Sequence, residues 1–334
     1  MKKILALMLI IVIISFTIES TEKTAKNNNS RLTDLKHEHL VAYIGAREEV
    51  GEALLSSFSK KTGCTYEFVR LSTEEIVKRV EKERKNPKAD VVIGGTLDAH
   101  KIMKEKNLSE PINLKNGMYI PSNLKDPDHY WFGYETEQLA IGINTERWEK
   151  EMKPLGISMP KNWKDLLDTR FKGNIVMPDP NTSGTAATFL SYIANAMGKE
   201  QGHEYFKQLK PLVATFTSTG YAPATYVASG EYILAINFLG DQKMMTSKHF
   251  PIISVVPNES VYSINAISKL RGGSQSKAAD EFLNYCLSES AARILRKVSY
   301  GTPARNSKKK IYSQKEEQEA DTEKVILYWN KLGD

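Results

Sequence analysis

The sequence predicts an α/β protein built from two doubly wound lobes. Short apolar stretches alternate with amphipathic helical stretches along most of the chain, and this order places helices on both faces of a largely parallel sheet. The stretch Asp90–Ile93 is expected to be a strand buried on both faces, as parallel strands are. The length of 334 residues allows roughly two domains of ordinary size.

The first expected lobe begins with three strands and two helices. Apolar residues recur at helical spacing between 54 and 58, and Gly63 follows as the residue that ends this helix. Ser72 or Thr73 is expected to cap the next helix. The glycine pair at 94–95 is expected to end the third strand. The predicted elements are strands at 40–44, 66–71 and 90–93 and helices at 47–61 and 74–85.

The second expected lobe follows a long irregular stretch. Two strands, at 131–134 and 139–144, are expected to cross out of the first layer. A long amphipathic helix at 276–297 is expected to close the chain's main pattern, because its apolar residues share one face. The remaining predicted elements are strands at 173–177, 212–216, 232–237, 252–256 and 263–267 and helices at 163–167, 186–197 and 222–229.

Charge and cysteine content exclude several classes of protein. The chain has 46 basic and 40 acidic side chains, a net charge of +6, and we expect them to be interspersed over the surface. Nucleic-acid binding is therefore not expected. Cys64 and Cys286 are too few for a disulfide scaffold or a cysteine zinc site. They are expected to be two separate buried thiols; the alternative is a disulfide, which export would permit.

The N-terminus has the pattern of an export signal. Lys2 and Lys3 precede an apolar run that Glu19 ends, well short of the ~20 residues that a membrane-spanning helix needs. We expect a signal peptide at 1–18, a flexible leader at 19–37, and a location in the periplasm or cell envelope. An uncleaved anchor is the alternative, since no small-residue cleavage site stands out.

Two loops rich in hydroxyls are candidate anion sites. Thr182, Ser183, Gly184 and Thr185 lie where a predicted strand meets a predicted helix, and 218–220 repeat this composition after the next strand. Free backbone N–H groups and the positive end of the helix favour an anion there. Ordinary helix capping by the same hydroxyls is the alternative.

A cation stands at another helix start. Arg47 follows a Gly-Ala loop and is placed unfavourably against the helix dipole unless it meets an anion; a solvated arginine is the alternative. Catalytic motifs are weak: the sequence has no Gly-x-Ser-x-Gly elbow, no Walker A loop and no dinucleotide fingerprint. We expect no enzymatic activity.

The order of these pieces resembles a known family. An apolar strand with a Gly-x-Arg turn, the strand 89–92, the motif Thr182–Thr185, the segment 227–231 and the helix start 278–283 follow one another as in the extracytoplasmic solute-binding proteins of ABC importers. The similarity is to the group of type 2 periplasmic binding proteins that bind ferric iron or sugar phosphates and phosphonates. It implies two α/β lobes joined by crossover strands, with the ligand between them.

The resemblance also implies domain limits and partners. We expect lobe 1 at 38–136 and 250–304 and lobe 2 at 137–249 and 305–334. The protein is expected to capture a small anionic solute, as a monomer, and to deliver it to a membrane permease with its ATPase. The alternatives are a ferric-iron receptor and an exported enzyme acting on phosphorylated substrates. No resident cofactor is implied; Fe³⁺ is the transported ligand in the iron alternative.

The family's iron ligands are not matched. Arg47 stands at the position of the histidine, Gly95 at that of the glutamate, and Phe238 and Leu239 at those of the tyrosine pair. Arginine cannot ligate a metal but binds phosphate or carboxylate through two parallel hydrogen bonds. An iron site would have to be rebuilt from Tyr134, Glu135, Tyr221 and Tyr226.

The expected anion site combines residues from both lobes, with Asp241 suited to hydroxyls of the solute. The predicted binding residues are Arg47, Gly94, Gly95, Thr96, Thr182, Ser183, Gly184, Thr185, Ser218, Thr219, Gly220, Tyr221, Asn237 and Asp241.

Overall fold

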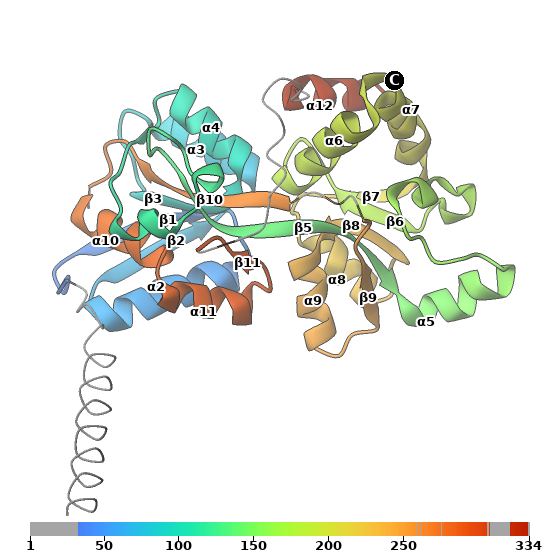
Figure 1. Cartoon of the computed structure of the whole chain (residues 1–334), viewed down its shortest axis with the longest axis horizontal. Coiled ribbons are helices and arrows are strands. Elements are labelled where there is room, and N and C mark those ends of the chain that lie inside the picture. The colour runs from blue at the N-terminus through green and yellow to red at the C-terminus, as the bar shows by residue number, and fades with distance from the viewer. Residues whose placement is uncertain are drawn as a thin grey trace, which may run out of the picture. The chain divides into compact units, whose positions relative to one another are not determined.

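The computed structural model describes residues 33–258, 260, 262–274, 276–305, 307 and 321–332. Strands and helices alternate through both halves of this part of the chain, as the sequence predicts (Figure 1). The signal peptide expected at 1–18 and most of the leader expected at 19–37 lie outside the described residues. Among the described helices, none is both long and apolar enough to cross a membrane.

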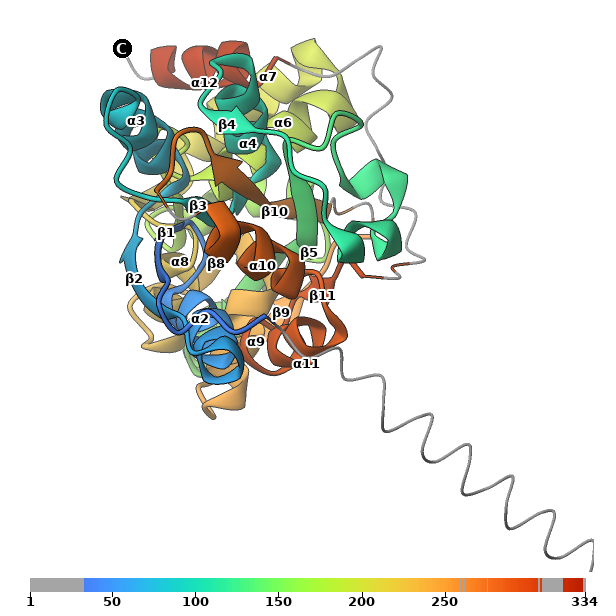
Figure 2. The same ribbon diagram turned by 90° about the vertical axis from the view of Figure 1, so that its left-hand side faces the viewer.

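The first lobe contains a sheet covered by helices on both faces (Figures 1 and 2). Its strands run in the order β2-β1-β3-β10-β5, with β1, β2 and β3 parallel and β10 antiparallel to β3. Helices α3 and α4 cover one face, and α2, α10 and α11 the other. The elements are β1 (His39–Ile44), α2 (Glu48–Thr62), β2 (Thr65–Arg70), α3 (Thr73–Glu83), β3 (Val91–Thr96), α4 (Leu97–Glu105), β4 (Ser109–Glu110), β10 (Tyr262–Leu270), α10 (Ser276–Cys286), α11 (Glu289–Val298) and β11 (Thr302–Pro303).

Local sequence sets the ends of these helices. α2 ends at Gly63, which adopts the left-handed conformation with φ of 78°. α3 begins with a complete capping box: Ser72 accepts from the backbone of Glu75, and the Glu75 carboxylate accepts from the backbone of Ser72. Both boundaries follow the sequence signals within two residues.

The second lobe is organised in the same way around strands β5, β8, β6 and β7. β6 is parallel to both of its neighbours. Helices α6, α7 and α12 lie on one side of this sheet, and α8 and α9 on the other (Figure 1). The elements are β6 (Ile175–Pro178), α6 (Gly184–Met197), α7 (Lys199–Leu209), β7 (Val213–Thr217), α8 (Ala222–Ala228), β8 (Leu234–Phe238), α9 (Leu239–Ser247), β9 (Ile252–Val255) and α12 (Thr322–Lys331).

Short helical turns fill the connections between these elements. They are η1 (Lys115–Tyr119) and η2 (Ser122–Leu124) in the first lobe, and α5 (Thr145–Arg147), η3 (Trp148–Met152), η4 (Lys153–Leu155), η5 (Trp163–Leu167), η6 (Thr169–Phe171) and η7 (Lys210–Leu212) in the second. η5 is the short helix predicted at 163–167.

One strand belongs to both lobes. β5 (Phe132–Asn144) is a continuous strand of 13 residues, where the sequence pattern predicted two strands. Its first half pairs with β10 and its second half with β8 and β9. The polar residues 135–138 made the pattern look interrupted, but they continue the strand. The two sheets are therefore continuous through β5.

Three other expectations about element limits differ from the structure. β3 continues through Gly94 and Gly95 to Thr96 and does not stop before the glycines. The helix expected at 276–297 is two helices, because Ser288 caps α11 by accepting from Ala291. β9 pairs with the second half of β5, so the chain returns to the first lobe after this strand and not at residue 250.

The hydrophobic core lies between each sheet and its helices. One cluster fills the second lobe and includes Trp163, Phe189, Phe206 and Trp329. Trp329 belongs to α12, which packs on α6. Cys64 and Cys286 are separate buried thiols, and burial raises the pKa of the Cys286 thiol.

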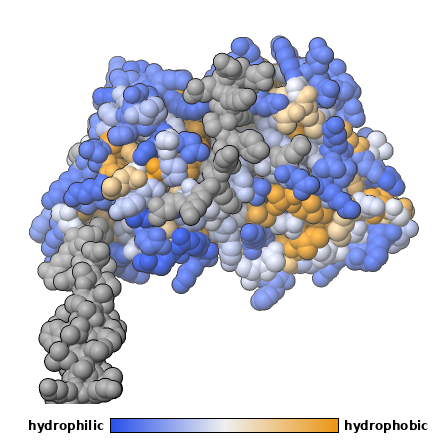
Figure 3. Space-filling view, viewed as in Figure 1, coloured by the Kyte–Doolittle hydropathy of each residue, from blue (hydrophilic) through white to orange (hydrophobic). Residues whose placement is uncertain are grey.

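The surface that Figure 3 shows is mostly hydrophilic, with apolar side chains gathered over β9. Ile253 of this strand and Phe250 just before it are large apolar residues exposed to solvent.

Candidate functional site

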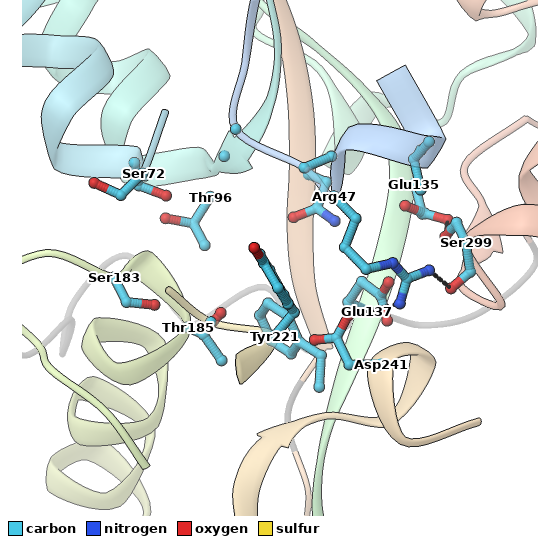
Figure 4. Close-up of a pocket in the computed structure, with 18 of the residues that line it drawn as sticks. Arg47, Ser72, Thr96, Glu135, Glu137, Ser183, Thr185, Tyr221, Asp241 and Ser299 are labelled. Atoms are coloured by element: carbon cyan, nitrogen blue, oxygen red, sulfur yellow. Dashed lines mark hydrogen bonds and ion pairs between the residues drawn. The ribbon is translucent and has the colours of Figure 1, made fainter. Parts of the chain in front are cut away.

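A cleft with about 600 Å³ of open volume lies between the two lobes. Its walls come from loops at the ends of β1, β2 and β3 on one side and from the starts of α6, α8 and α9 on the other (Figure 4). The lining residues are Gly45, Ala46, Arg47, Val50, Arg70, Ser72, Thr73, Gly95, Thr96, Glu135, Glu137, Ser183, Thr185, Gly220, Tyr221, Phe238, Asp241, Asn265 and Ser299.

Helix N-termini converge on this cleft. The N-cap residues of α2, α3, α4, α6 and α9 all line it: Arg47, Ser72, Thr96, Ser183 and Phe238. Except at α3, these helices have no capping hydrogen bond from the N-cap side chain. Free N–H groups and positive helix ends give the cleft a potential that favours an anion.

Hydroxyl groups face one another across one end of the cleft, near the starts of α3, α4 and α6. Figure 4 shows Ser72 and Thr96 on one side and Ser183 and Thr185 on the other. Thr96 is only 4% exposed, and its Oγ1 has no hydrogen-bond partner among the described residues. A buried hydroxyl without a partner is costly unless a bound group completes it.

Glycines allow the close approaches that shape this end. A Cβ on Gly184 would lie 2.2 Å from Oγ1 of Thr96, so the start of α6 reaches the end of β3 only because residue 184 has no side chain. A Cβ on Gly45 would lie 2.5 Å from the backbone nitrogen of Gly95. Gly95 itself has φ of 80°, a conformation that other residues rarely adopt.

The opposite end of the cleft is acidic. Glu135 and Glu137 project from β5, and Asp241 comes from the first turn of α9 (Figure 4). The Ser299 hydroxyl donates a hydrogen bond to Glu135, and the backbone of Gly240 donates to Glu137. Burial raises the pKa of Glu135 to about 7, and burial with the neighbouring carboxylates raises that of Glu137 well above its usual value.

Arg47 is the cation within this acidic end. Its Nη1 lies 2.7 Å from Oδ1 of Asp241, and the two side chains are 7% and 11% exposed. Its Nη2 donates to the carbonyls of Val298 and Ser299, at 2.8 and 3.1 Å. Burial lowers the pKa of Arg47, but Asp241 and the two glutamates raise it to a net value above the ordinary one. Burial also raises the pKa of Asp241, although Arg47 opposes this.

Eight of the predicted binding residues line the cleft: Arg47, Gly95, Thr96, Ser183, Thr185, Gly220, Tyr221 and Asp241. The other six lie beside it and shape its walls: Gly94, Thr182, Gly184, Ser218, Thr219 and Asn237. Thr182 donates to the carbonyl of Ser218, and the carbonyl of Thr219 accepts from Thr217. Asn237 is fully buried and bridges Asp241 and Gln242.

Sequence reasoning missed Arg70, Ser72, Thr73, Glu137, Asn265 and Ser299, all of which line the cleft. Arg70 ends β2, a strand parallel to β1, and the carboxyl ends of parallel strands share one edge of the sheet. That rule, applied to Arg70 and to the cap at Ser72, was the available signal. Asn265 and Ser299 lie far from Arg70 and Ser72 in the sequence, and no local pattern identifies them as site residues.

The four tyrosine and glutamate residues considered for iron are not brought together in one place. Tyr221 and Glu135 line the cleft. Tyr134 is buried, and its hydroxyl has no hydrogen-bond partner among the described residues. Tyr226 packs edge to face against Tyr232 in the second lobe, with ring centroids 6.0 Å apart. Within the part of the chain that the structure describes, no group of three or more His, Cys, Asp and Glu side chains could hold a metal ion.

Known proteins are similar to this chain in sequence and in fold. Residues 86–328 match the family model of the bacterial extracellular solute-binding proteins. A protein of unassigned function from Haemophilus influenzae is 32% identical over 76% of this chain and 74% of its own length. A Salmonella typhimurium protein described as a 2-aminoethylphosphonate-binding periplasmic protein is 26% identical over 75% and 72%.

Solved structures agree with these relatives. The periplasmic binding protein AfuA of Actinobacillus pleuropneumoniae, with fructose 6-phosphate bound, superposes with a TM-score of 0.77 at 29% identity, covering 87% of this chain and 93% of AfuA. Iron-bound HitA of Pseudomonas aeruginosa has a TM-score of 0.75 at 16% identity, covering 89% and 100%, a likeness of fold alone. The predicted two-lobed periplasmic binding protein fold is confirmed, and the Salmonella relative and AfuA are both described as binding proteins. The chain belongs to the bacterial extracellular solute-binding proteins and is a substrate-binding receptor of an ABC importer.

Proposed function

We propose that the solute is a small phosphorylated or phosphonate compound with a polar tail. Its anionic head would lie among the hydroxyls and helix N-termini contributed by Thr96, Ser183 and Thr185. Its tail would reach the acidic end, where Glu137 and Asp241 accept hydrogen bonds from hydroxyl or ammonium groups. The observation that carries this proposal is the buried Thr96 hydroxyl, which has no hydrogen-bond partner in the described part of the chain and lies where helix N-termini converge.

The relatives support the same class of solute. The solved AfuA structure holds fructose 6-phosphate, and the Salmonella protein is described as binding 2-aminoethylphosphonate. Both compounds combine a phosphorus oxyanion with hydrogen-bond donors on a short tail. A cleft with hydroxyl donors and helix N-termini at one end and carboxyls at the other suits that combination.

The proposed setting follows from the family and from the N-terminal sequence. The chain would be exported by the segment 1–18 to the periplasm or cell envelope and would work as a monomer. It would present its solute to a permease in the cytoplasmic membrane with its ATPase, without nucleic acid, without a resident cofactor and without chemical turnover.

Ferric iron is the second candidate for the transported ligand. Oxygen ligands are available in the cleft, since Tyr221, Glu135 and Glu137 all line it. Asp241, however, is already paired with the Arg47 guanidinium. A trivalent cation beside that guanidinium would be disfavoured by charge repulsion. We therefore place the phosphorylated anion first.

Titration calorimetry on the purified protein tests the choice. The ligands are inorganic phosphate, fructose 6-phosphate, fructose, 2-aminoethylphosphonate, and Fe³⁺ with citrate, each with and without a chelator. We expect binding of at least one phosphorus compound carrying a polar tail, and weaker or no binding of phosphate and fructose. Binding of iron alone, with a visible tyrosinate band, would refute the proposal.

Two variants tie the binding to this site. Thr96→Val and Ser183→Ala should each weaken binding of the phosphorus compound by roughly 5- to 100-fold, the cost of losing one hydrogen bond to a charged group. Ser247→Ala on the exposed end of α9 is the matched control and should bind like the parent. Recovery of the intact ligand by ³¹P NMR after long incubation distinguishes a receptor from an enzyme that consumes it.

A further inference from the structure

Two arginines line the cleft, and they differ in the hydrogen bonds that their terminal nitrogens make. Arg47 has its terminal nitrogens engaged by Asp241 and by the carbonyls of Val298 and Ser299. Two of these acceptors belong to the first lobe and one to the second. Arg47 therefore ties the lobes to each other, and its guanidinium has little donor capacity left for a solute.

Releasing Arg47 to a ligand would be costly. Asp241 would remain as a buried carboxylate beside Glu135 and Glu137 without a hydrogen-bonded guanidinium, since Arg70 acts on it only through its charge, without a hydrogen bond. A buried charge that loses its partner is strongly unfavourable, and the neighbouring carboxylates would add repulsion. An incoming phosphate would have to supply that energy before it gained anything from Arg47.

Arg70 has the free donors that Arg47 lacks. In the described part of the chain its one hydrogen bond is from Nε to the carbonyl of Ala46, a long one of 3.4 Å. Its Nη1 and Nη2 have no acceptor there. Arg70 is the last residue of β2, and Ser72 and Thr73, which follow it closely in the chain, line the same cleft. A guanidinium with free Nη groups is suited to hold a phosphorus oxyanion through two parallel hydrogen bonds.

The second lobe orients this side chain. The Arg70 guanidinium carbon lies 5.2 Å from the centre of the Tyr221 ring, within the range of a cation–π contact. Tyr221 comes from the loop that also contributes Gly220, which packs against Thr185, since a Cβ there would lie 2.2 Å from Oγ1 of Thr185. Arg70 and the hydroxyls of the second lobe therefore face the same part of the cleft.

Resting on the proposed function, we infer that Arg70 is the cation that binds the phosphoryl or phosphonyl group of the solute, and that Arg47 with Asp241 is a tie between the lobes. Arg47 is then not the anion ligand that the sequence suggested. Arg70 is the residue that makes the cleft prefer a phosphorylated solute over its neutral counterpart.

The test compares variants of the two arginines, using the phosphorus compound that the parent binds best and its dephosphorylated form. Arg70→Ala should weaken binding of the phosphorus compound by roughly 10- to 100-fold, with little change for the neutral form. Arg70→Lys should recover part of the loss, because it restores charge without the paired donors. Arg84→Ala, an exposed arginine at the end of α3, is the control for loss of positive charge.

The role of Arg47 and Asp241 is tested by a second measurement, the radius of gyration of the ligand-free protein. Arg47→Met with Asp241→Asn removes both charges of the pair, so that neither is left buried alone. Small-angle scattering of the ligand-free protein should then show a larger radius of gyration than the parent. The preference for the phosphorus compound over its neutral form should persist, and Arg70→Ala should leave the ligand-free radius close to that of the parent.

The outcomes separate this inference from the proposed function. If Thr96→Val and Ser183→Ala weaken binding and Arg70→Ala does not, the solute class stands and the assignment of Arg70 is wrong. If none of the three weakens binding, the proposed site fails. Loss of phosphorus selectivity in the Arg47 and Asp241 variant, with selectivity kept in Arg70→Ala, would restore Arg47 as the anion ligand.

Discussion

Glu135 is a buried carboxyl whose pKa reflects the groups around it. It lies in the first half of β5, buried beside Glu137 and Asp241, and the Arg47 guanidinium interacts with all three carboxyls. Burial raises its pKa from 4.5 to about 7. The acidic end of the cleft therefore holds protons that exposed carboxyls have already lost at the same pH.

This raised pKa makes stability depend on pH in a defined direction. Between pH 4.5 and about 7 the folded protein keeps a proton on Glu135 that the unfolded chain releases. The contribution of this group to the free energy of unfolding therefore falls as pH rises through that window and is constant above it. Urea denaturation at pH 5, 6, 7 and 8 should show a smaller decline for Glu135→Gln than for the parent.

The control for this measurement is Glu67→Gln, an exposed carboxyl on β2. It should follow the parent at every pH. A Glu135→Gln protein that loses stability as steeply as the parent between pH 5 and 7 would show that the proton resides elsewhere, with Glu137 as the next candidate.

Gly184 sets how closely the two lobes approach. An added methyl would lie 2.2 Å from Oγ1 and 2.7 Å from Cγ2 of Thr96. Gly184→Ala should therefore weaken solute binding by roughly 10-fold or more, since overpacking typically costs 1–3 kcal/mol. Calorimetry measures the loss. In a Thr96→Ala background the same change should cost much less, and an equal cost in both backgrounds would exclude this contact as the cause.

The sequence predicted this end of the site better than the acidic end, and the reason is local. Ser183, Thr185 and Thr96 stand at strand-to-helix junctions that a one-dimensional pattern identifies. The pairing of Arg47 with Asp241 joins residues 194 positions apart, and no spacing rule connects them. The hydroxyl loops were therefore predictable, whereas the partner of Arg47 was not.

At the scale of elements, α12 packs on α6, the helix whose N-cap residue Ser183 lines the cleft. Trp329 is only 2% exposed and packs edge to face against Phe206 and Phe216, at centroid distances of 5.7 and 5.9 Å. Asn330, the next residue, exchanges side-chain hydrogen bonds with Asn181 in the loop between β6 and α6. This helix thus links the core of the lobe to the loop that delivers Ser183.

The packing of α12 predicts a large stability effect from one residue. Trp329→Ala should lower the free energy of unfolding by about 3–5 kcal/mol, through lost burial and the cavity left behind. Leu327→Ala, on the same helix but 58% exposed, should change it by less than about 0.5 kcal/mol. Guanidinium denaturation measures both. Similar losses in the two variants would mean that the helix is not seated as described.

The elements that sequence reasoning placed correctly have strong local signals, such as the capping box of α3 and the glycine that ends α2. Those it misplaced have signals that only the tertiary structure explains. The run Glu135–Gln138 looked like a break in β5 because polar residues normally mark a loop, yet Glu135, Thr136 and Glu137 are buried and the two glutamates line the cleft. α10 and α11 looked like one helix because apolar spacing continues across Ser288, which caps the second.

At the scale of the whole molecule, the cleft has a chemical polarity, with donors and helix dipoles at one end and carboxyls at the other. A solute that satisfies both ends bridges the lobes, as the Arg47–Asp241 pair does in the structure. Binding energy and lobe closure are then coupled, because each contact to the solute is made from two sides.

The continuous strand β5 has a consequence for how the protein unfolds. The described residues from 35 onward belong to one compact unit, and a strand whose halves pair with different sheets cannot be withdrawn from one lobe without disturbing the other. Scanning calorimetry of the ligand-free protein should therefore give a single transition whose calorimetric and van't Hoff enthalpies agree. Two resolved transitions would contradict this. A destabilising substitution in either lobe, however far from the cleft, should then increase the unfolding of the whole receptor and not of one lobe alone.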